Sequence, residues 1–425
     1  MKRKMRAQEM DSRVLKKVFV LIDLPRDETR GGHMRVWEKF AATAAARPDL
    51  PVDLTLITMA RQRSEESLSD KVRIIGLPPV LSSHHLPFLR AMPSETDLAG
   101  WHPALAAMLV KAQVIHTTDA FFCMAQTAEK VAAKHHIPLV HSIHTDTPNY
   151  TRIFTRQLID SHLGFFGLNK WLNDFVQMPE KSGKNKDQQL QNHLKKCRHV
   201  WHGPVAGPMP APARHGLRSS SYLRRGIDKE FFNPARRDQA WLRQRFRLPD
   251  HHTILLSVGR LDASKNIHVV ADSVRIARDN GLAVHWLAVG QGAEAGALRQ
   301  KLGPHITLPG MIEGKELAKT YASADIFLFP AVHEITPNVV LEAKASGLPC
   351  LLASGSALYV ARSGHDAVLL PDVLPPTWAA EIGRFAAQPK VLEAIGLAAR
   401  RDIDDHRPSW ADVIQQDLLP VWLAT

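Results

Sequence analysis

Cysteines and long apolar runs are both scarce in this sequence. The three cysteines, Cys123, Cys197 and Cys350, are spread so widely over 425 residues that they fit neither a disulfide framework nor a metal knuckle, and we expect buried or inert thiols. No apolar run approaches the roughly 18–20 residues that a membrane-spanning helix needs. The apolar residues 18–22, behind a basic N-terminus, are too few for the core of a signal peptide. The sequence therefore predicts a cytoplasmic protein without a spanning helix.

Acidic residues are outnumbered by basic ones. The chain has 54 Lys and Arg against 42 Asp and Glu, a formal net charge of +12. Such a charge favours polyanionic partners, namely nucleic acid, acidic lipid headgroups or phosphorylated substrates. A solvated basic surface without a specific partner is equally compatible with it, so the charge alone selects no function.

Short β-rich apolar runs alternate with longer stretches of helical periodicity, which is typical of parallel α/β sheets. The pattern predicts two doubly wound domains, with ligands bound at the carboxyl ends of the strands and hence in the cleft between the domains. The expected strands are residues 18–22, 52–57, 72–75, 114–116 and 138–142 in the first half, and 253–258, 284–289, 306–308, 326–329, 349–353 and 368–370 in the second.

The middle of the chain, from about residue 178 to 233, breaks this alternation. It opens with the polar, Lys-rich run 180–196 and continues through the Pro- and Gly-rich stretch 203–216. Such a composition is typical of loops and linkers, so we expect irregular structure here.

The strongest local signal lies at residues 330–342, where a strand is expected to end and a helix to begin. Thr336 is a suitable N-cap, and Pro337 suits the first helical position because its missing N–H would be unpaired there. The N–H groups of Asn338 and Val339 would then point out of the helix end, where the helix dipole favours an anion such as a diphosphate.

Two glutamates flank this helix end. Glu334 lies in the loop before it, and Glu342 lies about one and a half turns into the helix. One carboxylate could reach sugar hydroxyls beside a bound diphosphate, and the other could reach a ribose. The alternative is a capped amphipathic helix with two solvated glutamates.

A glycine turn with two cations follows the strand expected at 253–258. Gly259 permits a close approach of the backbone to a ligand, and Arg260 and Lys265 could both neutralise a leaving diphosphate. Either cation alone would usually be a surface residue. Their coincidence with a phosphate-binding helix end further along the chain favours a functional interpretation.

These motifs resemble the donor-binding domain of the retaining glycosyltransferases of family four, over residues 254–370. The resemblance rests on the Glu334-to-Glu342 spacing, the Gly259–Lys265 segment, the glycine turn at 290–292, and the runs 312–330 and 341–349. It implies the GT-B fold, in which two Rossmann-like domains face each other across a cleft and the C-terminal domain holds the sugar nucleotide. It also implies that Gly290 and Met311 help to bind the donor.

The N-terminal half resembles the family more weakly. Gly31 and Gly32 open a helix expected at 33–44, and the resemblance implies that their backbone approaches the donor phosphates and the acceptor. A flexible loop is the alternative. His144, in the element 141–150, would contact the donor sugar by the same resemblance, whereas a histidine at a strand end is ordinarily a hydrogen-bonded core residue.

Three further segments bear on organisation and acceptor. Residues 86–93 resemble a segment of the family members that glycosylate lipids, among them mannosyl- and sulfoquinovosyltransferases. Residues 222–232 resemble the interdomain segment, and 410–422 resemble the helix that packs back on the first domain. The domains expected are 1–226, with 178–221 irregular, and 227–400, with 401–425 as the returning helix.

The sequence also departs from the family. Where the family often has Glu-x-Phe-Gly, this chain reads Glu334-Ile-Thr-Pro337, and the proline removes one backbone donor and fixes φ, which leaves the donor sugar open. No Asp-x-Asp motif sits where a donor domain would need it, so the cations and the helix end would replace a metal.

Taken with the resemblance, these residues predict a metal-independent retaining glycosyltransferase without a cofactor, which uses a UDP- or GDP-linked sugar and forms an α-linkage. Glu334, His144, Arg260 and Lys265 are the expected catalytic residues, and no nucleophile is assigned. The expected acceptor is a lipid or glycan, with possible peripheral contact to an anionic membrane on its inner face and no nucleic acid. The alternatives are a sugar-nucleotide epimerase or glycoside phosphorylase, and a non-catalytic polyanion-binding protein.

Overall fold

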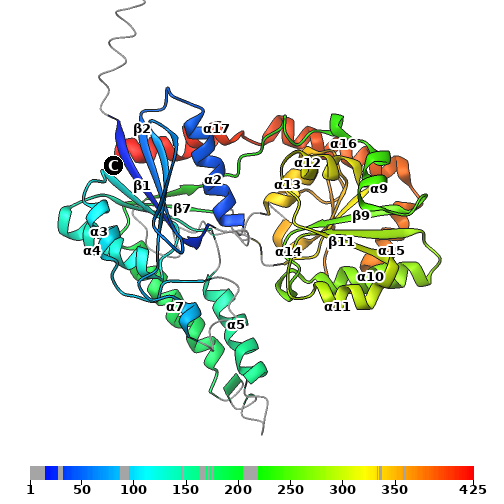
Figure 1. Cartoon of the computed structure of the whole chain (residues 1–425). Coiled ribbons are helices and arrows are strands. Elements are labelled where there is room, and N and C mark those ends of the chain that lie inside the picture. The colour runs from blue at the N-terminus through cyan, green and yellow to red at the C-terminus, as the bar shows by residue number, and fades with distance from the viewer. Residues whose placement is uncertain are drawn as a thin grey trace, which may run out of the picture. The chain divides into compact units, whose positions relative to one another are not determined.

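The computed structural model describes residues 15–26, 32–86, 95–144, 147–162, 169, 172–173, 176–203, 219–332, 334, 337–357 and 360–425. The chain forms two compact units, shown in Figure 1. Unit 1 comprises Met1–Arg224 together with Trp410–Thr425, and unit 2 comprises Arg225–Ser409. The second unit is therefore inserted between two segments of the first.

Unit 1 contains an eight-stranded sheet of order β3-β4-β2-β1-β5-β6-β7-β8. The β3–β4 pair is antiparallel and the other pairs are parallel. The strands are β1 Lys16–Pro25, β2 Val52–Met59, β3 Ser64–Ser69, β4 Val72–Leu77, β5 Val114–Thr117, β6 Leu139–Ser142, β7 His199–His202 and β8 Ser220–Tyr222.

Helices cover both faces of this sheet. Helix α2 (Gly32–Ala45) and the C-terminal helices share one core cluster with the sheet, while α3 and α4 share another on the opposite face. The remaining helical elements are η1 Ser83–His85, α3 Pro103–Leu109, α4 Cys123–His135, α5 Thr147–His162, α7 Met178–Leu194, α17 Trp410–Val413, η8 Ile414–Leu418 and α18 Leu419–Ala424. All three cysteines of the chain are buried, as expected.

The prediction of a loop for the Lys-rich run is wrong. This run forms helix α7, which packs alongside α5 (Figure 1). Arg152 of α5 pairs with Glu180 at 3.3 Å and with Asp187 at 2.6 Å on α7. Ion pairs with another helix thus replace most of the apolar stripe that would have revealed this helix in the sequence. The strands β7 and β8 also lie in the stretch predicted to be irregular.

Unit 2 contains a six-stranded parallel sheet of order β11-β10-β9-β12-β13-β14. All six strands predicted from the second half of the sequence are confirmed. They are β9 Thr253–Val258, β10 Val284–Val289, β11 Ile306–Gly310, β12 Ile326–Phe329, β13 Cys350–Ala353 and β14 Val368–Leu370.

The helices of unit 2 lie on both faces of its sheet. Helices α10, α11 and α15 cover one face, and α9, α12 and α13 cover the other (Figure 1). Helix α16 contributes to both core clusters, with Ile395 in the first and Ile403 in the second. The helical elements are η5 Pro234–Arg236, α9 Gln239–Phe246, η6 Ala263–Lys265, α10 Ile267–Asp279, α11 Ala295–Leu302, η7 Gly303–His305, α12 Gly314–Ser323, α13 Asn338–Ala345, α14 Ser354–Ala357, α15 Pro375–Ala386 and α16 Pro389–His406.

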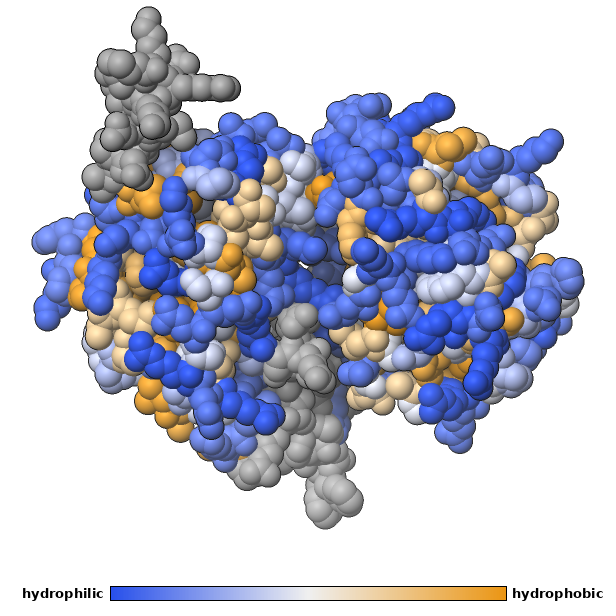
Figure 2. All heavy atoms as spheres, turned by 45° about the horizontal axis from the view of Figure 1, so that its top comes forward, coloured by the Kyte–Doolittle hydropathy of each residue, from blue (hydrophilic) through white to orange (hydrophobic). Residues whose placement is uncertain are grey.

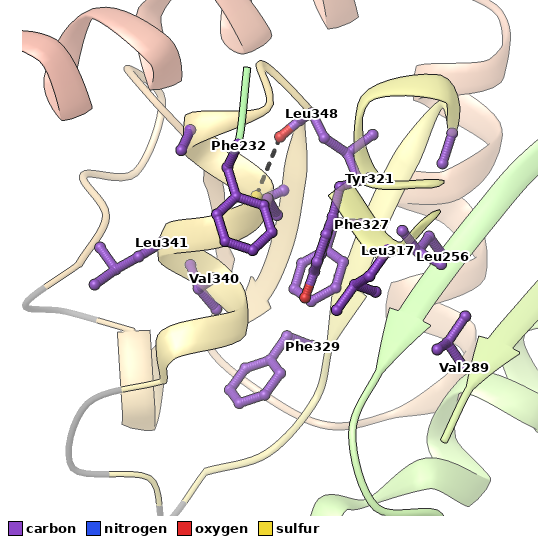
Figure 3. Close-up of a cluster of buried hydrophobic side chains, with 14 of the residues drawn as sticks. Phe232, Leu256, Val289, Leu317, Tyr321, Phe327, Phe329, Val340, Leu341 and Leu348 are labelled. Carbon is purple, nitrogen blue, oxygen red and sulfur yellow. Dashed lines mark hydrogen bonds between the residues drawn. The ribbon is translucent and has the colours of Figure 1, made fainter. Parts of the chain in front are cut away.

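A cluster of aromatic side chains fixes α12 and α13 on the sheet (Figure 3). The ring of Tyr321 on α12 lies 5.8 Å from those of Phe232 and Phe327. Val340 and Leu341 of α13, both buried, belong to the same hydrophobic cluster. Because these side chains are closely packed, the start of α13 has a defined position beside the end of β12.

The predicted domain boundary at residue 400 falls inside α16, which continues to His406. Arg400 on this helix donates hydrogen bonds to the carbonyl oxygens of Ala345 at 2.7 Å and Phe232 at 2.9 Å. These contacts tie α16 to the end of α13, so the helix is part of unit 2. The chain enters unit 1 again at Trp410.

The surface shown in Figure 2 is mainly hydrophilic, with apolar residues in small groups. Within the part of the chain that the structure describes, no helix has the length and apolar character required to cross a membrane.

Candidate functional site

Three of the predicted motifs follow strands that are neighbours in the unit 2 sheet. Strand β9 lies between β10 and β12. The loop at 259–265 follows β9, the glycine turn at 290–292 follows β10, and residues 330–337 follow β12. Since all three strands are parallel, the fold brings these motifs together at the carboxyl edge of the sheet.

Two of these loops touch through their backbones. Gly259 has φ +146° and Gly290 has φ +143°, conformations that side chains rarely permit. A Cβ on Gly290 would lie 1.8 Å from the carbonyl oxygen of Gly259, and one on Gly292 would lie 2.1 Å from that of Leu261. By contrast, a Cβ on Gly259 would meet no heavy atom within 4 Å. A ligand can therefore approach the backbone at Gly259.

Backbone hydrogen bonds hold the same loops in place. The Gly259 N–H donates to Val289 O at 3.0 Å, and the Leu261 N–H donates to Gln291 O at 2.9 Å. The Gly290 N–H donates to Gly310 O at 2.9 Å, which links the end of β11 to the same edge. Met311, directly after β11, is exposed. These hydrogen bonds fix the loops relative to one another at the edge of the sheet.

Lys265 and Glu334 form an ion pair, although 69 residues separate them in the sequence. Only 20% of the Lys265 side chain and 25% of the Glu334 side chain are exposed. The neighbouring Asn266, at φ +53°, donates from its side-chain amide to the carbonyl oxygen of Pro330 at 3.0 Å. The loops after β9 and β12 are therefore linked by a charge pair and by a hydrogen bond.

Arg260 is more accessible than Lys265. Its guanidinium lies 3.1 Å from the Asp262 carboxylate, and 41% of its side chain is exposed. Asp262 also accepts a hydrogen bond from the hydroxyl of Ser264 at 2.5 Å. Exposed ion pairs contribute little stability, so Arg260 can exchange its partner for an incoming anion at low cost.

Helix α13 begins one residue later than predicted. Pro337, with φ −75° and ψ 101°, is the N-cap residue and has no capping side chain, so its predicted place as the first helical residue is wrong. Its extended backbone leaves Asn338 and Val339 as the first residues of the helix. The predicted N-cap, Thr336, lies outside the described residues.

Glu342, on the second turn of α13, accepts a hydrogen bond from the hydroxyl of Tyr321 at 3.0 Å. Tyr321 is itself fully buried among the aromatic rings of Figure 3. The sequence reasoning missed this tyrosine, which lies in the run 312–330 quoted for the resemblance. Tyr321 fixes the direction of the Glu342 carboxylate.

Unit 1 contains the predicted His144, which follows β6 and is half-buried. Its Nε2 accepts a hydrogen bond from Trp37 Nε1 at 3.2 Å and lies 2.8 Å from Ser142 Oγ. The ring of His33 stacks on it at 4.3 Å. Gly32 is the first residue of α2, as the glycine pair predicted, whereas Gly31 lies outside the described residues.

The sequence analysis also missed a buried charge cluster around Lys344 of α13. Lys344, with no exposed side-chain surface, lies 3.2 Å from Asp366 and 2.6 Å from Asp402. Its ammonium group also donates to Val360 O at 2.6 Å. Burial of a lysine is costly unless it is paired and hydrogen-bonded, as here, so this cluster has a structural role.

Comparison with known proteins agrees with this arrangement. Residues 252–388, which contain all three loops, match the family described as Glycosyl transferases group 1. The chain is 32% identical over 161 residues to a GDP-mannose-dependent alpha-mannosyltransferase of Corynebacterium glutamicum, which covers 37% of this chain and 36% of that protein. It is 32% identical over 202 residues to a protein of the same name from Mycolicibacterium smegmatis, covering 47% and 51%.

A third relative is the sulfoquinovosyl transferase of Arabidopsis thaliana, 29% identical over 167 residues, with 38% of this chain and 29% of that protein covered. The chain thus matches about half or less of the length of these relatives. In each case the aligned part is a minority of this chain as well.

Solved structures extend the likeness in fold to both units. Sucrose-phosphate synthase from Thermosynechococcus elongatus gives a TM-score of 0.67 at 18% identity and covers 96% of this chain and 100% of that one. The glycosyltransferase WaaG, described as involved in lipopolysaccharide biosynthesis, gives 0.63 at 16%, with 92% and 95% covered. The chain has the GT-B fold, as predicted. Residues 252–388 match the group 1 glycosyl transferases, in agreement with the resemblance seen in the sequence.

Proposed function

We propose that this protein is a glycosyltransferase that transfers a sugar from a nucleoside-diphosphate sugar bound at the carboxyl edge of the unit 2 sheet. The observation that carries the proposal is the Lys265–Glu334 ion pair beside the open backbone of Gly259, within the segment that matches the family. A cation and a carboxylate in contact offer a phosphate and a sugar hydroxyl their complementary partners at adjacent positions.

The proposed chemistry assigns the developing charge to fixed groups. As the bond to the sugar breaks, negative charge builds on the β-phosphate oxygen, which Arg260, Lys265 and the N-terminus of α13 stabilise. Glu334 orients the sugar through its hydroxyls. Glu342, directed by the Tyr321 hydroxyl at 3.0 Å, binds the ribose. Transfer proceeds with retention and gives an α-linkage, in keeping with the resemblance to retaining enzymes and with the names of the α-mannosyltransferase relatives.

Turnover of candidate donors tests the proposal directly. The full chain is incubated with GDP-mannose, UDP-glucose or ADP-glucose, with and without a lipid or glycan acceptor, and release of the nucleoside diphosphate is measured. We expect one donor to be consumed only when an acceptor is present, and proton NMR of the product to show an α-anomer. Equal consumption without an acceptor would instead favour the epimerase or phosphorylase alternative.

Substitution of the two glutamates is expected to affect turnover and nucleotide binding differently. Glu334→Gln removes the partner of Lys265, so nucleoside diphosphate binding is retained or strengthened while turnover falls. Glu342→Gln weakens binding of the nucleoside diphosphate itself by about tenfold, the loss of one hydrogen bond to a charged group. Calorimetry with GDP and UDP, alongside turnover, separates these effects. Equal loss of nucleotide affinity in both variants would contradict the division of roles.

Activity is expected to survive chelation of divalent metals. The one Asp-x-Asp sequence in the chain is Asp402-Ile403-Asp404. Asp402 lies 2.6 Å from the ammonium of Lys344, and Asp404 lies 2.8 Å from the guanidinium of Arg400. Both carboxylates are therefore already paired with cations. Turnover measured in EDTA checks the expectation, and loss of activity that Mn²⁺ or Mg²⁺ restores would contradict it.

We further propose a lipid acceptor presented at an anionic membrane surface. Residues 86–93, the segment that resembles lipid-glycosylating relatives, lie mostly outside the described residues. The residues that flank them include exposed apolar side chains, namely Val80 at 52%, Leu81 at 45% and Leu98 at 38% exposure. The Leu98 N–H donates to Leu81 O at 2.8 Å, so two of the three are neighbours. A shallow apolar loop with basic side chains suits peripheral attachment.

Sedimentation with vesicles tests this attachment. Binding to anionic but not neutral vesicles is expected, weakened by salt and by Phe88→Ala or Arg90→Ala, because each basic residue near such a surface contributes about 1 kcal/mol. Leu397→Ala, at an exposed leucine of α16 in unit 2, serves as the control and should bind like the wild type. A protein that stays in the supernatant with anionic vesicles at low salt would exclude the membrane contact.

A further inference from the structure

A chain of hydrogen bonds leads from the C-terminal helix α18 to His144. Trp422 Nε1 lies 3.3 Å from His116 Nδ1, and His116 Nε2 lies 2.9 Å from Ser142 Oγ. Ser142 Oγ in turn lies 2.8 Å from His144 Nε2. Trp422, His116 and Ser142 are all buried, with 1%, 0% and 0% exposure, so water does not compete for these bonds.

The donor and acceptor properties of these groups determine which atom donates in each of these hydrogen bonds. An indole N–H only donates, so His116 Nδ1 must accept from Trp422. Burial, with smaller effects from His199 and His33, lowers the pKa of His116 to about 3, so the ring is neutral near pH 7. Its single proton is then on Nε2 and is donated to Ser142. The Ser142 hydroxyl has one hydrogen, which is left for His144 Nε2.

A second donor reaches the same nitrogen of His144. Trp37 Nε1, again able only to donate, lies 3.2 Å from His144 Nε2. Two N–H or O–H groups therefore converge on one acceptor. Because a nitrogen that accepts hydrogen bonds has no proton of its own, the proton of the His144 ring is on Nδ1. The His33 ring, stacked at 4.3 Å and 15°, restricts rotation of the ring out of this plane.

We propose that Trp422, His116, Ser142 and Trp37 are positioning residues that hold His144 as its Nδ1–H tautomer, so that it acts as a hydrogen-bond donor toward the sugar. The role toward the sugar rests on the proposed function. The tautomer itself follows from the donors and acceptors of unit 1 alone. The C-terminal helix α18 thereby sets the tautomer of His144, although Trp422 and His144 are far apart in the sequence.

Nitrogen NMR of the intact chain tests the tautomer without reference to activity. In protein labelled with ¹⁵N-histidine, long-range ¹H–¹⁵N spectra near pH 7 distinguish a protonated from an unprotonated ring nitrogen, and the His144 signals are those missing in His144→Gln. We expect a protonated Nδ1 and an unprotonated Nε2. A protonated Nε2, or a cationic ring, would overturn the proposal whether or not the protein transfers sugar.

Variants test whether this series of hydrogen bonds determines the tautomer of His144. Trp422→Phe keeps an aromatic ring but removes the first donor, and Ser142→Ala removes the hydroxyl; both should change the His144 nitrogen shifts toward a mixture of tautomers. Ser142→Thr retains the hydroxyl and should restore the wild-type pattern. Trp378→Phe, at a buried tryptophan of unit 2 that donates to Asp372 O at 3.0 Å, is the matched control and should leave His144 unchanged. Unchanged His144 nitrogen shifts in both Trp422→Phe and Ser142→Ala would overturn the proposal that these hydrogen bonds set the tautomer.

Kinetics add the functional readout. If His144 donates to the sugar, Trp422→Phe and Ser142→Ala lower kcat by about 10–100-fold, by analogy with the loss when the partners that orient metal-ligating histidines are removed, with little change in KM for the donor. A normal kcat alongside altered His144 shifts would overturn the role toward the sugar. Absence of any turnover in the wild type would instead count against the proposed function, while the NMR result would still decide the tautomer.

Discussion

Replacement of Lys344 by alanine is expected to lower the free energy of unfolding by about 3–5 kcal/mol, the loss typical of breaking a buried ion pair by removing one partner. Lys344 is fully buried between Asp366 and Asp402. Without its ammonium, Asp366 is left with Arg362, whose side chain is 59% exposed and 3.7 Å away. Denaturant unfolding measures the change. Lys344→Met should also destabilise, because it restores volume but not charge.

A surface lysine provides the matched control. Lys301 lies 2.7 Å from Asp272, and its side chain is 34% exposed. Lys301→Ala should therefore change stability by less than about 1 kcal/mol. A similar loss of stability in Lys301→Ala and Lys344→Ala would show that burial of the Lys344 ion pairs does not increase their contribution to stability.

The pH dependence of the Lys344 effect has a definite sign. Burial acts to raise the pKa of Asp402, but the hydrogen bonds and charges of Lys344 and Arg407 outweigh it, and the pKa is lowered. A lowered folded-state pKa gives stability that is complete above the unfolded-state value of about 3.9 and is lost as the pH falls through the folded-state value. The difference in the free energy of unfolding between the wild type and Lys344→Ala should therefore become smaller at acidic pH.

Loss of either cation at the sheet edge is expected to weaken nucleoside diphosphate binding by about 10–100-fold, or 1.5–3 kcal/mol for a charge-assisted hydrogen bond. The two variants should differ in detail. Lys265→Ala also removes the positive charge next to Glu334, so that this carboxylate repels a bound diphosphate more strongly. Arg260→Ala removes an ion-pair partner only from the partly exposed Asp262, so this variant should lose less nucleoside diphosphate affinity than Lys265→Ala.

Calorimetry with GDP and UDP measures these affinities. Lys319→Ala, whose partner is Asp238 at 2.9 Å on a different part of unit 2, controls for the loss of one positive charge. An unchanged dissociation constant in both Arg260→Ala and Lys265→Ala would exclude the proposed phosphate site.

The sequence predicted unit 2 better than unit 1, for a physical reason. Buried parallel strands are continuous apolar runs, so all six strands of unit 2 could be recognised. Strand β3, Ser64–Ser69, is mostly exposed and polar at the edge of its sheet, and nothing in its composition indicates a strand. Helix α7 is polar and depends on ion pairs with α5, which sequence periodicity does not reveal.

The same distinction applies to the site. Motifs that follow neighbouring strands could be predicted to meet, and Lys265, Glu334 and the glycine turns do so. Contacts that depend on packing between distant segments could not be predicted, such as Tyr321 with Glu342 or Trp422 with His116. A lysine on the apolar face of the 338–345 helix was the available signal for the buried charges, since such a residue requires counter-ions.

The insertion of unit 2 into unit 1 has a consequence for how the chain folds during synthesis. Trp422, Leu418 and Val413 belong to the core that α2 and strand β1 form, although unit 2 is translated in full before them. Domains usually fold in order from the N-terminus as they emerge. Here the part of the first sheet's apolar face that α2 does not cover stays exposed until residues 410–425 are made, whereas unit 2 has all of its own core by Ser409. The second domain to be translated is thus the first that can finish folding, and a chain interrupted before residue 410 presents an exposed hydrophobic surface to chaperones and proteases.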